Sequence, residues 1–176
     1  MALINKVMPG YVATLWMQDG ATPTVLTVAQ LSTWTGQVAD IIGTTAGGTG
    51  TGGDAVPVET IPPFGADDAS ASYAVAGART GAKITTQNAV TSMTITAAWN
   101  PSDTALLQIR SDGYDGSTIR TYVIAVYDQD GADTVAYSFN ARVGGLQWDM
   151  SPSAEGKFTF TLHPVGGEEY GWSNNA

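Results

Sequence analysis

Regular alternation of apolar and polar side chains in the second half of the chain is the strongest constraint on its fold. In residues 89–99, AVTSMTITAAW, apolar side chains alternate with Ser and Thr. Successive side chains of a strand point to opposite faces, so this pattern predicts a half-buried antiparallel strand. Residues 118–127, 133–143 and 157–163 predict three more strands, whose polar faces hold mostly Thr, Ser and Asn. The predicted core face comprises Met93, Ile95, Ala97, Trp99, Val135, Tyr137, Phe139, Ala141, Val143, Phe158, Phe160 and Leu162.

The first half of the chain carries weaker strand signals. Residues 10–17 alternate and end at a turn signal, Asp19-Gly20. Short strands are also expected at residues 24–28 and 36–42, and an extended segment at 56–61. The acidic stretch 65–71 and the AGARTG stretch 76–81 are expected to be a loop and a turn. In the second half, Asp130-Gly131 predicts the hairpin turn that joins residues 118–127 to 133–143.

One helix is expected, over residues 100–113. Asn100 is a candidate N-cap, Pro101 suits the first helical position, and Asp103 falls in the first turn. Gly113 is a natural end. The predicted fold is therefore mainly β, with two packed antiparallel sheets in a sandwich- or barrel-like arrangement, one short flanking α-helix and a long Gly-rich loop.

Composition limits the possible functions. The 176 residues suit one domain and include no cysteine, so neither disulfides nor thiolate metal sites are available. The net charge of −9 argues against binding nucleic acid through its phosphates. Only 13% of residues are charged, which suggests that copies of the chain cover much of its surface, or else that it is a low-charge sandwich domain. We find neither a signal-peptide run nor a stretch long enough to span a bilayer.

The glycine-rich segment GTTAGGTGTGGD, residues 43–54, contains a G-x-G-x-x-G pattern at Gly48, Gly50 and Gly53. A dinucleotide site needs a helix directly after these glycines, to supply amides to the pyrophosphate. The prolines in the following AVPVETIPPF exclude that helix. We therefore expect no cofactor, and a loop of this length is more often functional or disordered.

Catalytic and metal-binding signals are weak. His163 is the only histidine and lies at a strand end, where a surface position is expected. The common hydrolase, protease and P-loop motifs do not occur, so we expect no enzyme, although a hydrolase with dispersed carboxylates stays possible. Asp128, Asp130 and Asp133 lack the spacing of an EF-hand and predict a solvated hairpin tip. A turn between helix and strand is expected at Asp112, Gly113, Asp115 and Gly116.

The five tryptophans allow two interpretations. Trp99 lies on an apolar strand face and is expected in the core, whereas Trp34 and Trp172 lie near loops and suit a subunit interface. The alternative is a sugar-stacking platform in a carbohydrate-binding β-sandwich module.

The order of features resembles the tail tube, or major tail, proteins of long-tailed bacteriophages. The likeness runs from about Gly36 to Gly167. It rests on TWTGQVADIIG, a long variable loop, VETI, DDAS, AGARTG, the TSMTITAAWNPSDTALLQIRSDG stretch and closing strands that end in FNARVGGLQWDMSPSAEGKFTFTLHPVGG. The resemblance implies two packed sheets with a flanking helix, in hexameric rings that stack into a tube for DNA. An alternative is another phage structural protein, for tail completion or head decoration.

The resemblance also implies partners and a location. The partners are further copies of the chain, a tape-measure protein, a tail terminator and distal tail proteins, with transient passage of DNA. The location is the virion tail, after assembly in the host cytoplasm. The domain is expected to span residues 1–176, with an N-terminal arm at 1–9, a stacking loop at 43–54 and a C-terminal tail at 168–176.

Two sets of site residues follow from this reading. Acidic side chains on the lumen would repel DNA phosphates and prevent trapping. The candidates for contacts between rings are Gly43, Thr44, Thr45, Gly48, Thr49, Gly50, Asp54, Trp34, Tyr170 and Trp172. The candidates for the acidic lumen are Asp67, Asp68, Asp128, Asp130 and Asp133.

Overall fold

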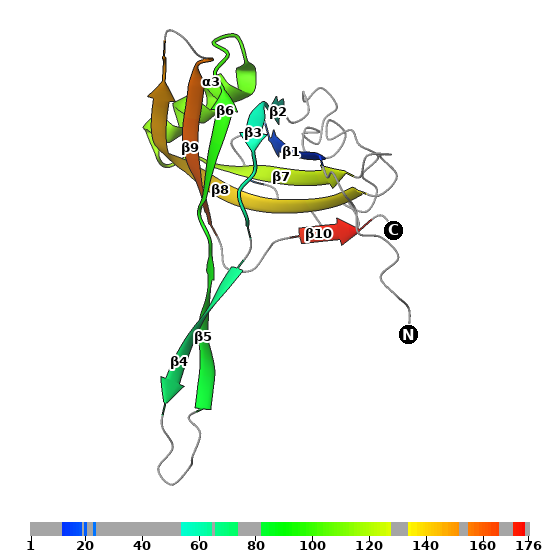
Figure 1. The fold of residues 1–176 in the computed structure, drawn as a ribbon, viewed down its shortest axis with the longest axis vertical. Helices are drawn as coiled ribbons and strands as arrows, with labels where there is room; N and C mark the ends of the chain where they lie inside the picture. Colours follow the sequence, from blue (N-terminus) through cyan, green and yellow to red (C-terminus); the bar gives the residue numbers. More distant parts are fainter. Residues whose placement is uncertain are drawn as a thin grey trace.

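A computed structural model describes residues 12–18, 20, 23, 54–64, 66–73, 82–127, 134–151, 155–165 and 171–174 (Figure 1). These residues are mainly β, as predicted, with one helix, α3 (Thr104–Asp115). The strands are β1 (Val12–Met17), β2 (Asp54–Val56), β3 (Val58–Thr60), β4 (Ala66–Tyr73), β5 (Ala82–Val90), β6 (Met93–Ala98), β7 (Ile119–Tyr127), β8 (Thr134–Asp149), β9 (Lys157–Pro164) and β10 (Gly171–Asn174).

Eight of these strands form one antiparallel sheet. Their order is β2-β1-β7-β8-β9-β6-β3, with β10 also paired to β8, while β4 and β5 pair separately. The sheet is not closed into a barrel, because its end strands β2 and β3 do not pair with each other. They are consecutive along the chain and separated by Pro57, whose carbonyl accepts a hydrogen bond from the Ala98 amide at 3.3 Å.

A bend in β8 divides this sheet into two halves. Strand β7 pairs with β8 as far as Arg142, whereas β9 pairs with β8 from Ala141 to Asp149. The register shifts between Gly144 and Gln147, and Gly145 has φ +61°. We call β2-β1-β7 with the start of β8 the first half-sheet, and the end of β8 with β9-β6-β3 the second. The two packed sheets expected from the sequence are thus one bent sheet, because β8 belongs to both halves.

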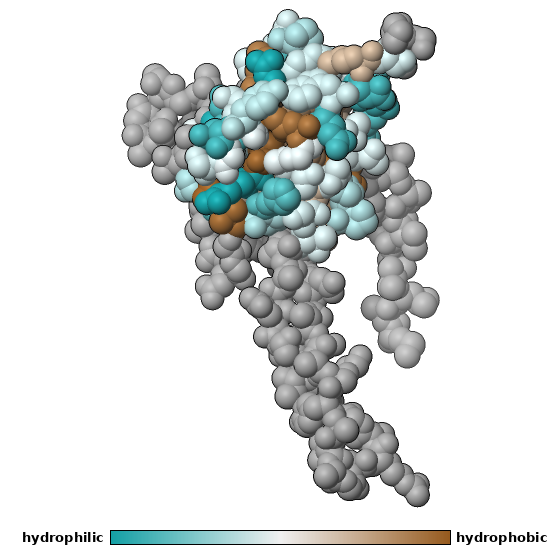
Figure 2. Space-filling model, turned by 90° about the vertical axis from the view of Figure 1, so that its left-hand side faces the viewer, coloured by the Kyte–Doolittle hydropathy of each residue, from teal (hydrophilic) through white to brown (hydrophobic). Residues whose placement is uncertain are grey.

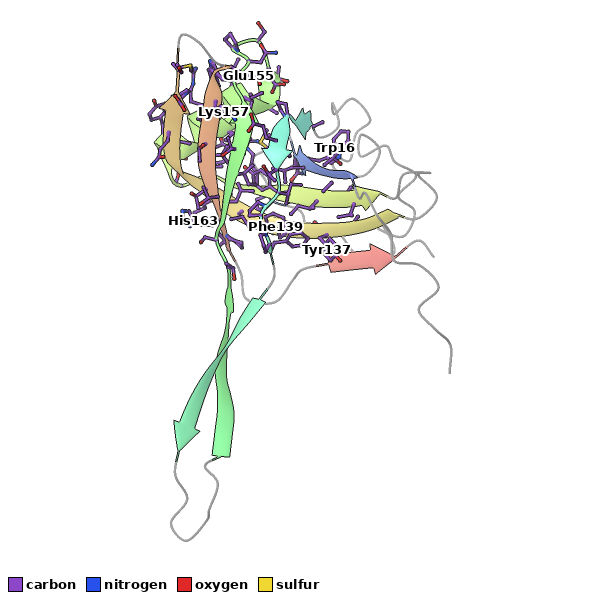
Figure 3. All side chains as sticks on the ribbon, in the orientation of Figure 1. Trp16, Tyr137, Phe139, Glu155, Lys157 and His163 are labelled. Atoms are coloured by element: carbon purple, nitrogen blue, oxygen red, sulfur yellow. The ribbon has the colours of Figure 1, made fainter. Side chains whose placement is uncertain are left out.

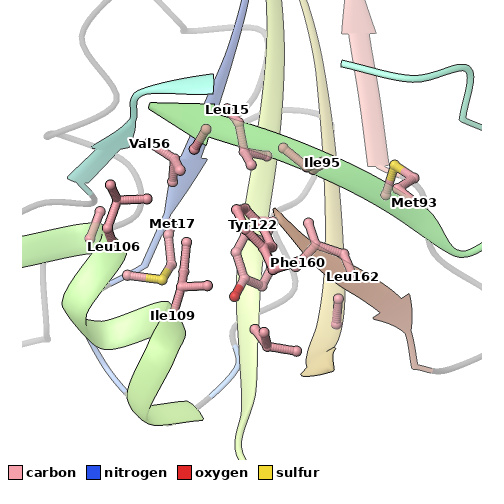
Figure 4. Close-up of a cluster of buried hydrophobic side chains, with 14 of the residues drawn as sticks. Leu15, Met17, Val56, Met93, Ile95, Leu106, Ile109, Tyr122, Phe160 and Leu162 are labelled. Carbon is pink, nitrogen blue, oxygen red and sulfur yellow. The ribbon is translucent and has the colours of Figure 1, made fainter. Parts of the chain in front are cut away.

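The hydrophobic core lies between the two half-sheets and α3 (Figure 4). Each element contributes its alternate apolar side chains, and the predicted face of β6 and β9 is confirmed. Trp99 and Tyr137 are partly buried against the core, whereas the side chain of Val135 lies outside the described residues. The labelled core residues are Leu15, Met17, Val56, Met93, Ile95, Leu106, Ile109, Tyr122, Phe160 and Leu162.

The helix begins later and ends later than the predicted range 100–113. The N-cap is Asp103, whose Oδ1 accepts from the Leu106 amide at 2.9 Å. Asn100 instead closes a turn, since its Oδ1 accepts from the Ser102 amide at 3.0 Å and its carbonyl from the Asp103 amide at 3.1 Å. Both residue types favour caps and turns, so the sequence alone does not separate the two roles.

The predicted turn at residues 112–116 is mostly helix, and only Gly116 is its left-handed C-cap. Asp112 lies in the last turn of α3 and forms a buried ion pair with Arg120 of β7. The Arg120 Nε donates to one carboxylate oxygen and Nη2 to the other at 3.1 Å. Gln108 adds a third donor at 2.9 Å. This pair joins the helix to the first half-sheet.

Residues 66–71 of the stretch 65–71, expected to be a loop, form most of strand β4. Strand β4 pairs with β5 in antiparallel fashion, so that Ala66 faces Val90 at one end and Tyr73 faces Ala82 at the other. The register shifts after Ala69. Figure 1 shows this hairpin extending from the base of the body along the long axis. The sequence pattern missed these strands because small and polar residues dominate β4, β5 has few large apolar residues, and strand propensity depends strongly on context.

We predict that Gly145→Ala destabilises the fold more than Gly116→Ala does. Both glycines have positive φ, 61° and 67°, which costs an alanine about 1–2 kcal/mol. A Cβ at Gly145 would lie 2.9 Å from Thr161 Oγ1, whereas nothing lies within 4 Å of one at Gly116. Urea unfolding of both variants measures the difference, and equal losses would show that the bend tolerates the extra methyl group.

We predict that Asp112→Ala lowers the free energy of unfolding by about 3–5 kcal/mol, because it leaves the Arg120 guanidinium buried and uncompensated. The control is Tyr122→Phe. The buried Tyr122 hydroxyl has no hydrogen-bond partner among the described residues, and burial, then the charge of Asp112, raises its pKa. Its removal should cost little or stabilise the protein. Similar losses in both variants, measured by urea unfolding, would contradict this assignment.

Candidate functional site

The outer side of β6 and β9 is an open polar surface, which we call the threonine face: Ser92, Thr94, Thr96, Thr159, Thr161 and His163. Its hydroxyl groups form hydrogen bonds across the two strands. The Oγ1 atoms of Thr94 and Thr161 lie 3.1 Å apart, and those of Thr96 and Thr159 also lie 3.1 Å apart. Because each hydroxyl has a partner on the neighbouring strand, the face has little need of an external ligand to satisfy it.

The two ends of the threonine face are marked by polar pairs (Figure 3). At the end remote from the hairpin, Lys157 Nζ donates to Glu59 Oε2 at 2.9 Å. This hydrogen bond, together with the charge of Glu59, raises the pKa of Lys157. Near the hairpin, Ser92 Oγ lies 2.9 Å from His163 Nδ1. Arg142 lies opposite His163 in the register and is exposed.

The first half-sheet has no comparable open face at its centre. Tyr122 and Ile124 of β7 point into the core, so the alternating side chains of Val123 and Ala125 point away from it. Both are nevertheless fully buried, at 0% exposure. Thr121, on the same side, is buried and donates to Asn140 Oδ1 at 2.8 Å. The open polar face therefore belongs to the second half-sheet.

The last part of β8, residues 144–149, is a free strand edge. Strand β9 pairs with it on one side, and β7 leaves β8 at Arg142. In the described part of the chain no other strand pairs there, and no further backbone hydrogen bond reaches these residues. An unpaired edge of this kind is a template for pairing with another chain.

An aromatic patch lies beside this free edge, made of Arg110, Ser111, Tyr114 and Trp148. These four residues line a hollow of about 400 Å³. Tyr114 and Met150 are the large hydrophobic side chains exposed in the described residues, at 73% and 52%. The Tyr114 ring stacks on Trp148 with 6.3 Å between centroids and 20° between planes.

Trp148 anchors the aromatic patch to the core. Its ring lies 4.9 Å from Phe158 and 6.2 Å from Trp99, between centroids. Gly113 allows α3 to approach β8 here, because a Cβ on it would meet the Leu146 side chain at 2.7 Å. The patch is thus held on two rigid elements. Figure 2 views the molecule from the side that carries the end of β8, where polar residues surround small apolar areas.

Most predicted contact residues lie outside the described part of the chain. This holds for Gly43, Thr44, Thr45, Gly48, Thr49, Gly50, Trp34 and Tyr170, and for Asp128, Asp130 and Asp133. Asp54 begins β2 opposite Met17, Asp67 and Asp68 belong to β4, and Trp172 lies in β10 opposite Tyr137. Their roles in contacts and in the lumen stay predictions.

The described residues contain no cluster of three potential metal ligands and no helix long and apolar enough to cross a membrane. The expected surface position of His163 is confirmed, since its side chain is exposed. Sequence reasoning noted the Thr-rich strand faces but missed the aromatic patch. The only signal for the patch was an aromatic residue near the helix end and another near the end of β8.

Comparison with solved structures finds the same fold in two large assemblies. One match is a chain in the cryo-EM structure of the anti-feeding prophage baseplate, 6-fold symmetrised, with TM-score 0.59 and 10% identity over 94% of this chain and 95% of that one. A second match comes from the PVC sheath/tube terminator of an extracellular contractile injection system in its extended state. Its TM-score is 0.62, with 12% identity over 93% and 96% of the two chains. No family model and no curated protein matches the sequence. The chain therefore shares a fold with these proteins.

Proposed function

We propose that the chain is a non-enzymatic structural component of a phage-tail-like particle, and that it forms stacked hexameric rings as a tail tube. The observation that carries the proposal is the fold, which follows a chain of the anti-feeding prophage baseplate and a chain of an injection-system sheath/tube terminator over nearly their whole lengths. The first of these assemblies is 6-fold symmetrised, which supports a ring of six.

The surfaces of the chain support assembly with copies of itself. Residues 144–149 of β8 are an unpaired edge, and the β4–β5 hairpin has only two strands. A two-stranded hairpin is marginally stable in water unless it packs against something else. Low charge over the whole chain, at 13% of residues, also suits burial between subunits. One copy thus offers both an edge that can receive a strand and strands that lack neighbours.

The threonine face is our candidate for the wall of the channel. Its hydroxyls are paired across β6 and β9, and the charge of Lys157 is balanced by Glu59. A wall with few unpaired cations gives passing DNA phosphates little to bind, so the polymer can slide. The acidic lining by Asp67, Asp68 and the Asp128–Asp133 segment stays a separate prediction.

The further partners that we propose are a tape-measure protein inside the tube and a terminator and distal tail proteins at its ends. The site of action is the virion tail after assembly in the host cytoplasm. A second candidate function is a single ring at one end of a tail, because the matched structures are a baseplate and a terminator.

The test of the proposed function is negative-stain electron microscopy of the purified chain at rising concentration, with sedimentation velocity in parallel. Hollow tubes of uniform width are expected from a tube protein, whereas discrete rings would favour the terminal-ring candidate. A monomer at every concentration would overturn self-assembly. Glycan binding by that monomer, lost on substitution of Trp34 or Trp172, would support the carbohydrate-binding alternative.

We predict that deletion of residues 44–53 leaves a folded monomer that does not form tubes. The segment is expected to contact the adjacent ring, and its glycines give it conformational range at an entropic cost that the contact offsets. Circular dichroism and urea unfolding check that the variant folds, and electron microscopy checks assembly. Normal tubes from this variant would remove the stacking role of residues 43–54.

A further inference from the structure

The aromatic patch has the composition of a protein-binding hot spot. Tyr, Trp and Arg are enriched at such sites. Tyr114 exposes 73% of its surface, although it lies on a rigid helix beside the anchored Trp148. Arg110 is exposed at the rim of the hollow, and no ion pair to it occurs among the described residues. None of these side chains has a role in the channel wall.

The β4–β5 hairpin offers a complementary surface on the same chain. Its two strands pair with each other, and their outer edges have no strand partner in the described residues. Strand β4 begins with Ala66-Asp67-Asp68, so its sequence carries two negative charges, opposite in sign to Arg110. An extended segment can add to a free strand edge through main-chain hydrogen bonds, and the end of β8 provides such an edge next to the patch.

The hairpin cannot reach the patch of its own chain. Figure 1 places α3 and the end of β8 in the part of the body remote from the base where the hairpin leaves. A contact between these two surfaces therefore joins different copies in a head-to-tail manner. Such a heterologous contact repeats along an axis and produces rings or open polymers instead of closed dimers.

We propose that the aromatic patch and the adjoining β8 edge of one copy receive the β4–β5 hairpin of a second copy, with Arg110 beside the aspartates of β4. This contact takes the place of the lumen position predicted from the sequence for Asp67 and Asp68. This inference rests on the proposed self-assembly and assigns two surfaces that form the contact. Tyr114 and Trp148 supply the apolar area, and Arg110 selects the acidic strand.

The absence of native cysteines makes cross-linking a direct test. Ser111→Cys places a thiol in the patch, and Ser70→Cys or Asp68→Cys places one on β4. A tagged patch variant and an untagged hairpin variant are mixed under assembly conditions and treated with a short bis-maleimide. We expect mixed cross-linked dimers at least tenfold above those from a control pair. The control uses Ser102→Cys, which is exposed in the turn before α3, at the opposite end of the helix from Tyr114 and away from the β8 edge.

A charge reversal gives an independent readout. Arg110→Glu is expected to raise the protein concentration needed for assembly at least tenfold. Adding Asp67→Lys and Asp68→Lys to that variant is expected to restore assembly. Arg142→Glu makes the same charge change at another exposed arginine and should assemble normally. If the wild-type chain assembles but the mixed cross-links do not form, this inference is wrong and the proposed function stands. The same holds if Arg110→Glu assembles at the wild-type concentration. A wild-type chain that never assembles overturns both.

Discussion

The bend in β8 is the constraint on which the rest of the structure depends. A single strand of 16 residues pairs with β7 up to Arg142 and with β9 from Ala141 onward. Gly144 and Gly145 follow this change of partner directly, where the register with β9 shifts. Gly145 adopts a positive φ with Thr161 close to the position of a Cβ, so glycine is the residue that fits there. The two half-sheets can then face each other and enclose one core.

The same bend gives the two half-sheets different surroundings. Strand β7 is buried on both sides, whereas β6 and β9 bury one side and expose hydroxyls on the other. It also separates β7 from the end of β8, which leaves residues 144–149 without a strand on that side. The helix packs beside this edge and is tied to β7 by the Asp112–Arg120 pair. The open face, the free edge and the aromatic patch thus follow from one change of strand direction.

The sequence predicts these features unevenly, for physical reasons. Alternation is local, so the core faces of β6 and β9 could be predicted from Met93, Ile95, Phe158 and Phe160. The Asp112–Arg120 pair could not, because it depends on chain reversal at the helix end and on burial of both groups. Strands β4 and β5 hold few large apolar residues, so their sequences carry only a weak period-two signal. The sheet edge at β8 is a property of topology and has no sequence signature.

The hairpin and the body have different sources of stability. The body buries side chains such as Tyr122, Phe158 and Phe160 between two half-sheets and a helix, which supports a fold in a single copy. Among the described residues, the pairing of β4 with β5 provides the hydrogen bonds of the hairpin, and such bonds contribute about 0.5–1.5 kcal/mol each after exchange with water. Ordering each residue costs a similar amount, so the two terms nearly cancel without apolar burial. A second copy that covers the hairpin would supply that burial, and the stability of the hairpin would then depend on protein concentration while that of the body would not.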